Sequence, residues 1–173
     1  TPRTKLVMLN YLIYPTGAAP TEAELAALAA VLRKHPHVWV ICDDMYEHLV
    51  YGDFKHTTLA QVAPDLKDRV VTVSGVSKTY AMTGWRVGFA GGPKELIRAM
   101  VNMQGQATAG VSTVGQAAAA AALDGPQDIV ADMKAQYNAR RDMVVAALNK
   151  MPGIACHKPE GAFYVFPNIA GCL

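Results

Sequence analysis

The chain has 173 residues, of which 51% are hydrophobic, and its formal net charge is +2. This length is sufficient for one domain with its own core, or for part of a larger domain. A net charge this close to zero gives no strong field for a polyanion, so nucleic acid is not an expected partner.

The first half of the chain alternates short apolar runs with a helical pattern. Leu6–Leu9 is a run typical of a buried strand. A helix is predicted to begin after Thr21, because Thr21 and Glu24 have the spacing of a capping box. Two further strands are predicted at Val38–Cys42 and Arg69–Val73.

The second half continues this alternation with longer helices. A fourth strand is predicted at Trp85–Ala90, followed by helices over Lys94–Met103 and Gln116–Leu123. After Gly125 and Pro126 a long helix is expected to run to about residue 150, and Phe163–Phe166 is predicted as a fifth strand. Strands that alternate with helices predict an α/β fold with a mainly parallel sheet.

The apolar residues and the cysteines bear on the compartment. No run of about 18 apolar residues is present, so no membrane-spanning helix is expected, and the first residues lack the apolar stretch of a signal peptide. The cysteines are odd in number and far apart, at Cys42, Cys156 and Cys172. This usage predicts reduced thiols and a cytoplasmic protein.

Polar side chains follow three predicted strands at the points where these strands end. They are Asn10, Asp43 and Lys78. Ligands of open α/β sheets bind at the carboxyl edge of the strands, so these residues are candidates for a site. A partly desolvated lysine at this edge is a nucleophile toward carbonyl groups, whereas a lone lysine is otherwise an ordinary solvated loop residue.

The sequence around Lys78 is the most specific motif in the chain. The segment from Gly75 to Gly88 reads GVSKTYAMTGWRVG and resembles the cofactor-lysine motif of class I aminotransferases. The chain is therefore similar to the fold type I enzymes that use pyridoxal 5′-phosphate (PLP), on the aspartate-aminotransferase-like branch. DDMYEH from Asp43 to His48, PTG at 15–17 and GAFYVFP at 161–167 resemble further landmarks of this family, in family order.

This resemblance implies an architecture and an activity. Residues 1–125 would be the central part of the PLP-binding large domain, and residues 126–173 the long interdomain helix and the start of the small domain. The activity implied is transfer of an amino group from an aspartate-like amino acid to a 2-oxo acid. Family members are dimers and the segment 106–116 resembles their contact region, so a homodimer, or assembly with another chain, is expected.

The resemblance also assigns roles to five residues. Lys78 would hold the cofactor as a Schiff base and then carry the proton as general base and acid. Asp43 would keep the ring nitrogen protonated, and Tyr46 would donate a hydrogen bond to the phenolic oxygen. Arg86 would bind the phosphate, with Ser77 adding a hydroxyl contact. Without the family resemblance, Asp43 would be interpreted as a turn residue and Tyr46 as a core residue. Arg86 would be interpreted as one partner of a surface ion pair.

The chain departs from the family pattern in two ways. Tyr14 stands where the family has an asparagine that binds the cofactor ring oxygen, so PLP binding is expected to weaken unless Tyr14 turns outward. Family members are also more than twice this length, and their glycine-rich phosphate loop, stacking aromatic ring and substrate-clamping arginine have no counterpart here. The alternative function is therefore a catalytically inactive fragment that acts as a binding or assembly module.

Three other kinds of site are not supported by the sequence. A phosphate-binding P-loop requires glycine directly before the lysine and again five residues earlier, where this chain has Ser77 and Thr72. No zinc pattern is present, because His35 and His37 flank a proline in a turn and there is no Cys-x-x-Cys. The Gly-x-Ser-x-Gly element of serine hydrolases is also missing, and no metal is expected.

Overall fold

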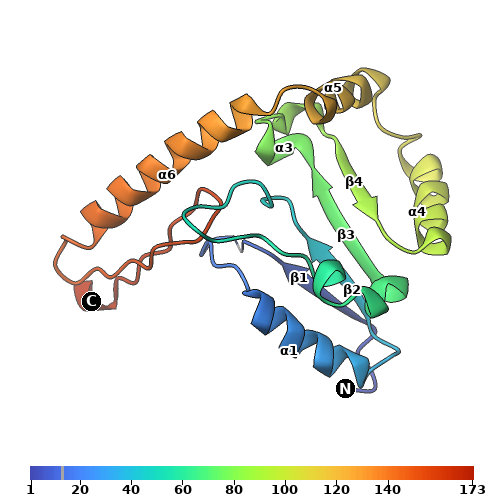
Figure 1. Ribbon diagram of the computed structural model, residues 1–173, viewed down its shortest axis with the longest axis horizontal. Helices are drawn as coiled ribbons and strands as arrows, with labels where there is room; N and C mark the ends of the chain where they lie inside the picture. The colour runs from blue at the N-terminus through green and yellow to red at the C-terminus, as the bar shows by residue number, and fades with distance from the viewer. Residues whose placement is uncertain (13) are drawn as a thin grey trace.

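The computed structural model describes residues 1–12 and 14–173, which contain a mixed four-stranded sheet (Figure 1). The strands are β1 (Leu6–Asn10), β2 (Trp39–Asp43), β3 (Val70–Gly75) and β4 (Gly88–Gly91), and they neighbour one another in chain order. β1, β2 and β3 are parallel, and β4 is antiparallel to β3. The prediction of an α/β fold with a mainly parallel sheet is confirmed.

Helices connect the strands and follow them. Six α-helices lie in the described part of the chain: α1 (Glu22–Arg33), α2 (Leu59–Val62), α3 (Val76–Thr79), α4 (Lys94–Ala107), α5 (Thr113–Asp124) and α6 (Asp128–Leu148). Short 3-10 turns occupy Pro64–Arg69, Thr83–Trp85 and Ala170–Cys172. None of the described helices combines the length and the apolar character that crossing a bilayer requires.

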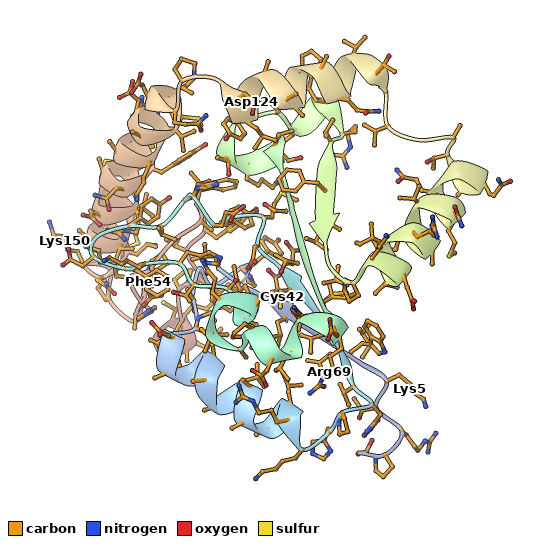
Figure 2. The ribbon with its side chains drawn as sticks, turned by 45° about the vertical axis from the view of Figure 1, so that its right-hand side comes forward. Lys5, Cys42, Phe54, Arg69, Asp124 and Lys150 are labelled. Carbon is orange, nitrogen blue, oxygen red and sulfur yellow. The ribbon has the colours of Figure 1, made fainter. Side chains whose placement is uncertain are left out.

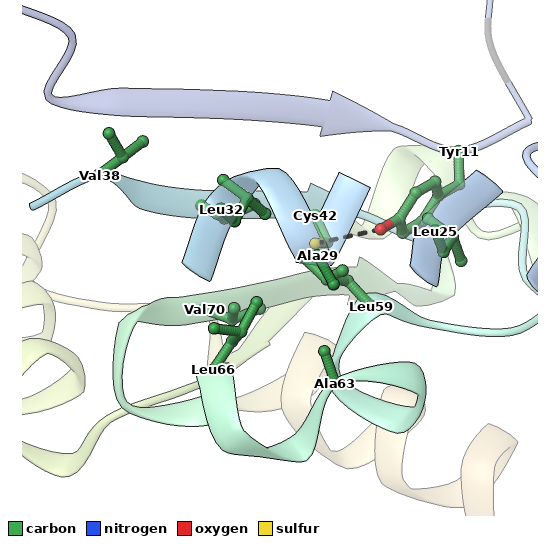
Figure 3. Close-up of a cluster of buried hydrophobic side chains, with 11 residues drawn as sticks. Tyr11, Leu25, Ala29, Leu32, Val38, Cys42, Leu59, Ala63, Leu66 and Val70 are labelled. Atoms are coloured by element: carbon green, nitrogen blue, oxygen red, sulfur yellow. Dashed lines mark hydrogen bonds between the residues drawn. The ribbon is translucent and has the colours of Figure 1, made fainter. Parts of the chain in front are cut away.

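The main core lies between α1, α2 and one face of the sheet (Figure 3). The capping box predicted at Thr21 and Glu24 is present and fixes where α1 begins. From there the helix turns Leu25, Ala29 and Leu32 toward the sheet. Its partners alternate along the strands, since every second side chain of a strand points to the same face. They are Val38, Val40, Cys42 and Val70, with Tyr11, Leu59, Ala63 and Leu66 closing the cluster.

A partly buried arginine ties this layer to the start of β3. The guanidinium of Arg69 donates to the carbonyls of Leu32 and Val38 at 2.7 Å and of His35 at 3.1 Å. These carbonyls belong to the end of α1 and to the turn that leads into β2. Arg69 therefore joins three segments at the lower end of the sheet, where Figure 2 labels it.

The opposite face of the sheet is largely open. Leu6, Met8 and Trp39 point to this face and are 47%, 68% and 39% exposed. Among the described helices α4 contributes Leu96 and Met100 to this side, and α4 itself contains no fully buried residue. A sheet of parallel strands normally has both faces covered, so this face is unusual for the fold.

The predicted fifth strand is wrong, and the predicted fourth strand is wrong in its first residue. Phe163–Phe166 is not a strand: Ala162 adopts a left-handed φ of 56°, and the nearby pairing is limited to single bridges at Gly161 and Asn168. The aromatic side chains that suggested a strand instead pack on other aromatic rings. The fourth strand begins at Gly88 rather than Trp85, because Arg86 also has a φ of 56° after the 3-10 turn.

Candidate functional site

The candidate residues gather where β2 and β3 end. In the register of the sheet Asp43 is opposite Asn10 on one side and Val73 on the other. The chain leaves β3 at Gly75 and enters α3, so Lys78 follows directly at the same edge. Gly75 is required there, since a Cβ at this position would lie 2.9 Å from the carbonyl oxygen of Val87.

Lys78 lies between two aromatic rings. Its Nζ is 5.8 Å from the ring centroid of Tyr46 and 5.8 Å from that of Phe163. The side chain is partly buried, and the two rings are 5.5 Å apart at an edge-on angle. An ammonium near ring faces is attracted by their negative charge distribution, which fixes the position of the amine without neutralising it.

Tyr46 is the buried phenol beside this amine. Its hydroxyl is 2.6 Å from the hydroxyl of Tyr164, a short hydrogen bond between side chains 118 residues apart. Burial raises the pKa of Tyr46 well above its ordinary value, and the bond with Tyr164 adds to this effect. Tyr46 therefore stays protonated at neutral pH and is able to donate a hydrogen bond.

Tyr14 reaches the same cluster from the N-terminal segment. It is 64% exposed, and its ring meets that of Tyr164 edge-on with centroids 4.8 Å apart. The ring of Tyr14 is thus exposed to solvent and also lies in the aromatic cluster beside Tyr46, so the weakened cofactor binding expected from Tyr14 stays a prediction. The rest of the Tyr11–Tyr14 stretch includes Ile13, which lies outside the described residues.

The other predicted residues lie at the same edge with different surroundings. The Oδ1 of Asp43 accepts a hydrogen bond of 3.2 Å from the backbone N–H of Met45, and its side chain is partly buried. Ser77 is partly buried in α3 beside Lys78. Arg86 is exposed and donates from Nη1 to the Thr83 carbonyl at 2.9 Å. The amine of Lys78 thus lies next to the ring of Tyr46, whereas Arg86 lies on the turn before β4.

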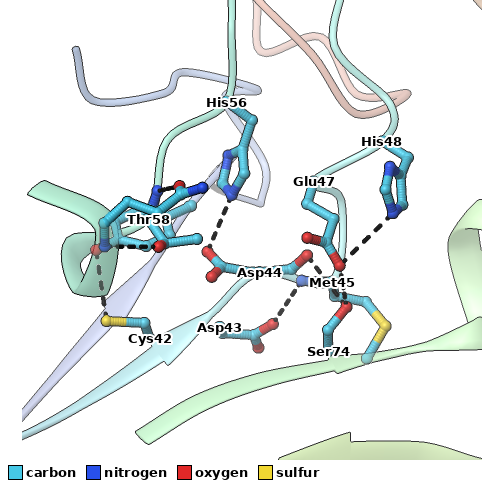
Figure 4. Close-up of polar contacts among 11 residues, drawn as sticks. Cys42, Asp43, Asp44, Met45, Glu47, His48, His56, Thr58 and Ser74 are labelled. Carbon is cyan, nitrogen blue, oxygen red and sulfur yellow. Dashed lines mark hydrogen bonds and ion pairs between the residues drawn. The ribbon is translucent and has the colours of Figure 1, made fainter. Parts of the chain in front are cut away.

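A second polar group that sequence analysis missed, Asp44 with His56, lies next to Asp43 (Figure 4). The carboxylate of Asp44 is fully buried, 3.4 Å from Nε2 of His56. Neither of its oxygens has a hydrogen-bond donor among the residues that the structure describes. Burial raises the pKa of Asp44, and the neighbouring His56 acts in the opposite direction.

Phe163 and Tyr164 are the site residues that sequence analysis did not identify. They come from the segment that was predicted as a strand, and they contact Lys78 and Tyr46 respectively. Their aromatic character is evident from the sequence, but only the fold places them next to Lys78 and Tyr46. The assembled site is an amine, a protonated phenol and a carboxylate at one sheet edge, a set suited to holding a planar carbonyl compound.

Comparison with known proteins gives a consistent family. A family model described as aminotransferase class I and II matches residues 1–171. The aspartate/prephenate aminotransferase of Cereibacter sphaeroides is 55% identical over 173 residues, which is all of this chain and 43% of that relative. The aspartate aminotransferase of Rhizobium meliloti is 54% identical over the same length and 42% of its own.

Solved structures agree with the sequence comparison. The crystal structure of the Rhizobium meliloti aspartate aminotransferase matches with a TM-score of 0.98 at 53% identity, over 100% of this chain and 43% of that one. An aromatic aminotransferase from Pyrococcus horikoshii matches with a TM-score of 0.91 at 39% identity, over 96% of this chain and 44% of that one. The chain spans less than half the length of each of these proteins.

Proposed function

Because this chain belongs to the class I and II aminotransferase family, we propose that it carries the cofactor-lysine part of a PLP-dependent aminotransferase. The reaction is transfer of an amino group from an aspartate-like amino acid to a 2-oxo acid. The observation that carries the proposal is the position of Lys78, whose amine lies 5.8 Å from the ring centroid of buried Tyr46, at the edge where Asp43 ends β2.

The donor set at this edge suits PLP. The cofactor has an aldehyde, a phenolic oxygen, a pyridine nitrogen and a phosphate, and when bound as a Schiff base to a lysine it supplies an electron sink. Lys78 offers the amine, Tyr46 a protonated hydroxyl and Asp43 a carboxylate. Arg86 adds a guanidinium with donors still exposed, and Ser77 a hydroxyl.

Each of these side chains has a task that follows from its chemistry. Lys78 would hold the aldehyde through its amine and would move a proton to and from the substrate carbon. Tyr46 would donate a hydrogen bond to the phenolic oxygen, which its raised pKa permits because the hydroxyl keeps its proton. Asp43 would favour the protonated pyridine nitrogen, and Arg86 would bind the phosphate with its planar fork.

The same proposal extends to organisation and location. We place the boundary between large-domain and small-domain residues at 125/126, just before α6. All three cysteines are free, which supports a reducing compartment such as the cytoplasm. We propose a homodimer or an assembly with another chain, because the segment 106–116 resembles the region through which the dimeric family members contact their partner.

Absorbance spectroscopy tests this proposal. PLP added to the purified chain is expected to give a saturable shift of its visible band, since conversion of the aldehyde to a Schiff base changes its absorption. Lys78→Arg is expected to abolish the shift, whereas Lys94→Arg, a control on exposed α4, is expected to retain it. Equal shifts in all three proteins, or none in the wild type, would contradict the proposal and leave the binding or assembly module as the alternative.

A further inference from the structure

The turn that ends at Ala162 is docked against the loop that follows β2 (Figure 1). The backbone N–H of Ala162 donates to the Leu49 carbonyl at 2.8 Å. In return the N–H of Tyr51 donates to the Glu160 carbonyl at 2.9 Å. A Cβ at Gly161 would lie 2.6 Å from the carbonyl oxygen of Leu49, so only glycine permits this approach. The two segments are therefore in contact at backbone distance.

Ala162 adopts a backbone conformation that alanine disfavours. Its φ is 56°, in the left-handed region where the Cβ of an L-residue is crowded by the carbonyl oxygen. Such a conformation persists only where the surrounding structure determines it. Ala162 is 1% exposed, so the contacts that determine it come from neighbouring residues rather than from solvent.

The peptide groups on both sides of Ala162 are held by different partners. The N–H side is held by the Leu49 carbonyl, whereas the Ala162 carbonyl accepts a hydrogen bond from the hydroxyl of Tyr51. This carbonyl belongs to the peptide group that leads to Phe163. Because each peptide group is planar, a bond to its carbonyl fixes the direction in which the chain leaves the turn.

Tyr51 is itself fixed in place. It is 3% exposed, and the guanidinium carbon of Arg141 on α6 lies 4.7 Å from the centroid of its ring. Arg141 also donates from Nη1 to the Pro159 carbonyl at 2.9 Å, so one arginine contacts both the tyrosine and the turn. Burial raises the pKa of Tyr51 to about 12. Its hydroxyl therefore keeps the proton that it donates at neutral pH.

The two residues that follow Ala162 are the ones that reach the lysine site. The ring centroid of Phe163 is 5.8 Å from Nζ of Lys78. The hydroxyl of Tyr164 is 2.6 Å from that of Tyr46. Both aromatic residues come directly after the turn in the chain. A rotation about the backbone of Ala162 would consequently move both rings away from their partners.

We propose that Tyr51 is a positioning residue for the lysine site, because its hydroxyl holds the left-handed turn at Ala162 and thereby places the two aromatic side chains that follow. The inference rests on the proposed function, since it concerns the site at which PLP would bind. It adds a residue that lies outside the cofactor-lysine motif and that acts through the turn rather than on the reacting atoms. The placement of the rings requires no PLP.

Nuclear magnetic resonance of the PLP-free 173-residue chain tests the inference. The ring of Tyr46 is expected to give nuclear Overhauser cross-peaks with the rings of Phe163 and Tyr164, whose centroids are 5.5 and 5.8 Å away. Tyr51→Phe keeps the buried ring and removes the hydroxyl alone. It is expected to reduce these cross-peaks to about half or less, because the turn then populates other backbone conformations.

Two further variants separate positioning from a general loss of stability. Tyr11→Phe is the matched control: Tyr11 is also 3% exposed, and its hydroxyl donates to Cys42 in the main core, so the cross-peaks are expected to stay unchanged. Ala162→Gly added to Tyr51→Phe is expected to restore the cross-peaks, because glycine adopts a positive φ without a steric penalty. A mere loss of stability would be deepened by this glycine, whose chain entropy is higher.

Titration with PLP supplies a second measurement. Tyr51→Phe is expected to raise the half-saturating PLP concentration of the spectral shift about two- to tenfold, the equivalent of one hydrogen bond. Should Tyr51→Phe fail to fold, Arg141→Lys replaces it in both measurements. This variant keeps the charge but loses the planar group over the Tyr51 ring, and the same directions are expected.

Four results would overturn the inference. They are unchanged cross-peaks in Tyr51→Phe, an equal loss in Tyr11→Phe, a loss that Ala162→Gly does not restore, and an unchanged half-saturating PLP concentration. The cross-peaks are measured without PLP. If they respond as expected while the wild type shows no Lys78-dependent spectral shift, the positioning by Tyr51 stands and the proposed function alone fails.

Discussion

The hydrogen bond between Tyr46 and Tyr164 predicts that the double variant Tyr46→Phe/Tyr164→Phe is more stable than the single variant Tyr164→Phe. The two hydroxyls are 2.6 Å apart, Tyr46 is buried and Tyr164 is half-buried. Tyr164→Phe leaves the Tyr46 hydroxyl buried without its partner, which costs about 1–3 kcal/mol. Tyr46→Phe leaves the Tyr164 hydroxyl able to reach water, so its cost is about 0.5–1 kcal/mol.

Removal of both hydroxyls removes the unpaired buried group as well. The double variant keeps both rings, whose centroids are 5.8 Å apart, and is expected to be more stable than Tyr164→Phe alone. Urea unfolding of the four proteins measures the free energies. Tyr14→Phe is the control, because Tyr14 contacts the same ring from an exposed position. Additive losses, with the double variant the least stable, would refute the reasoning.

Two further predictions concern groups outside the lysine site. Arg69→Lys is expected to lower the free energy of unfolding by about 1–3 kcal/mol, because one ammonium cannot reach the three carbonyls to which the guanidinium donates. In the same urea experiment Arg98→Lys, a control on exposed α4, is expected to change the free energy of unfolding little. Asp44 has a raised pKa, so its burial costs stability as pH rises from about 4, the ordinary aspartate value, through the folded-state pKa. Asp44→Asn is therefore expected to gain stability relative to wild type with rising pH in that window, and a pH-independent difference between the two proteins would contradict the assignment.

Most of the fold could be predicted because local pattern and tertiary packing agree. The apolar runs at β1, β2 and β3 and the capping box of α1 specify elements that the core then buries. The fifth strand was wrong because aromatic residues favour strands only where they pack on a sheet. In Phe163 and Tyr164 those rings pack on Tyr46 and Tyr137 instead, next to the left-handed Ala162.

The proximity of the candidate residues could be predicted, because the two motifs that contain them each follow a strand. Lys78, Tyr46 and Asp43 follow strand ends, and the sheet register brings those ends to one edge. Phe163 and Tyr164 approach from more than 80 residues away, and no local pattern indicates such a contact. The burial of Asp44 could not be predicted either, because an acidic pair after a strand does not indicate which of its two carboxylates faces the interior.

The measurement that tests the central claim most directly is the site of covalent labelling by PLP. The chain is mixed with PLP, reduced with borohydride and digested, and the pyridoxyl mass is mapped by mass spectrometry. The account predicts one labelled residue, Lys78, with less label in Asp43→Ala and Arg86→Ala. Label spread over surface lysines, or absent from Lys78, would contradict it.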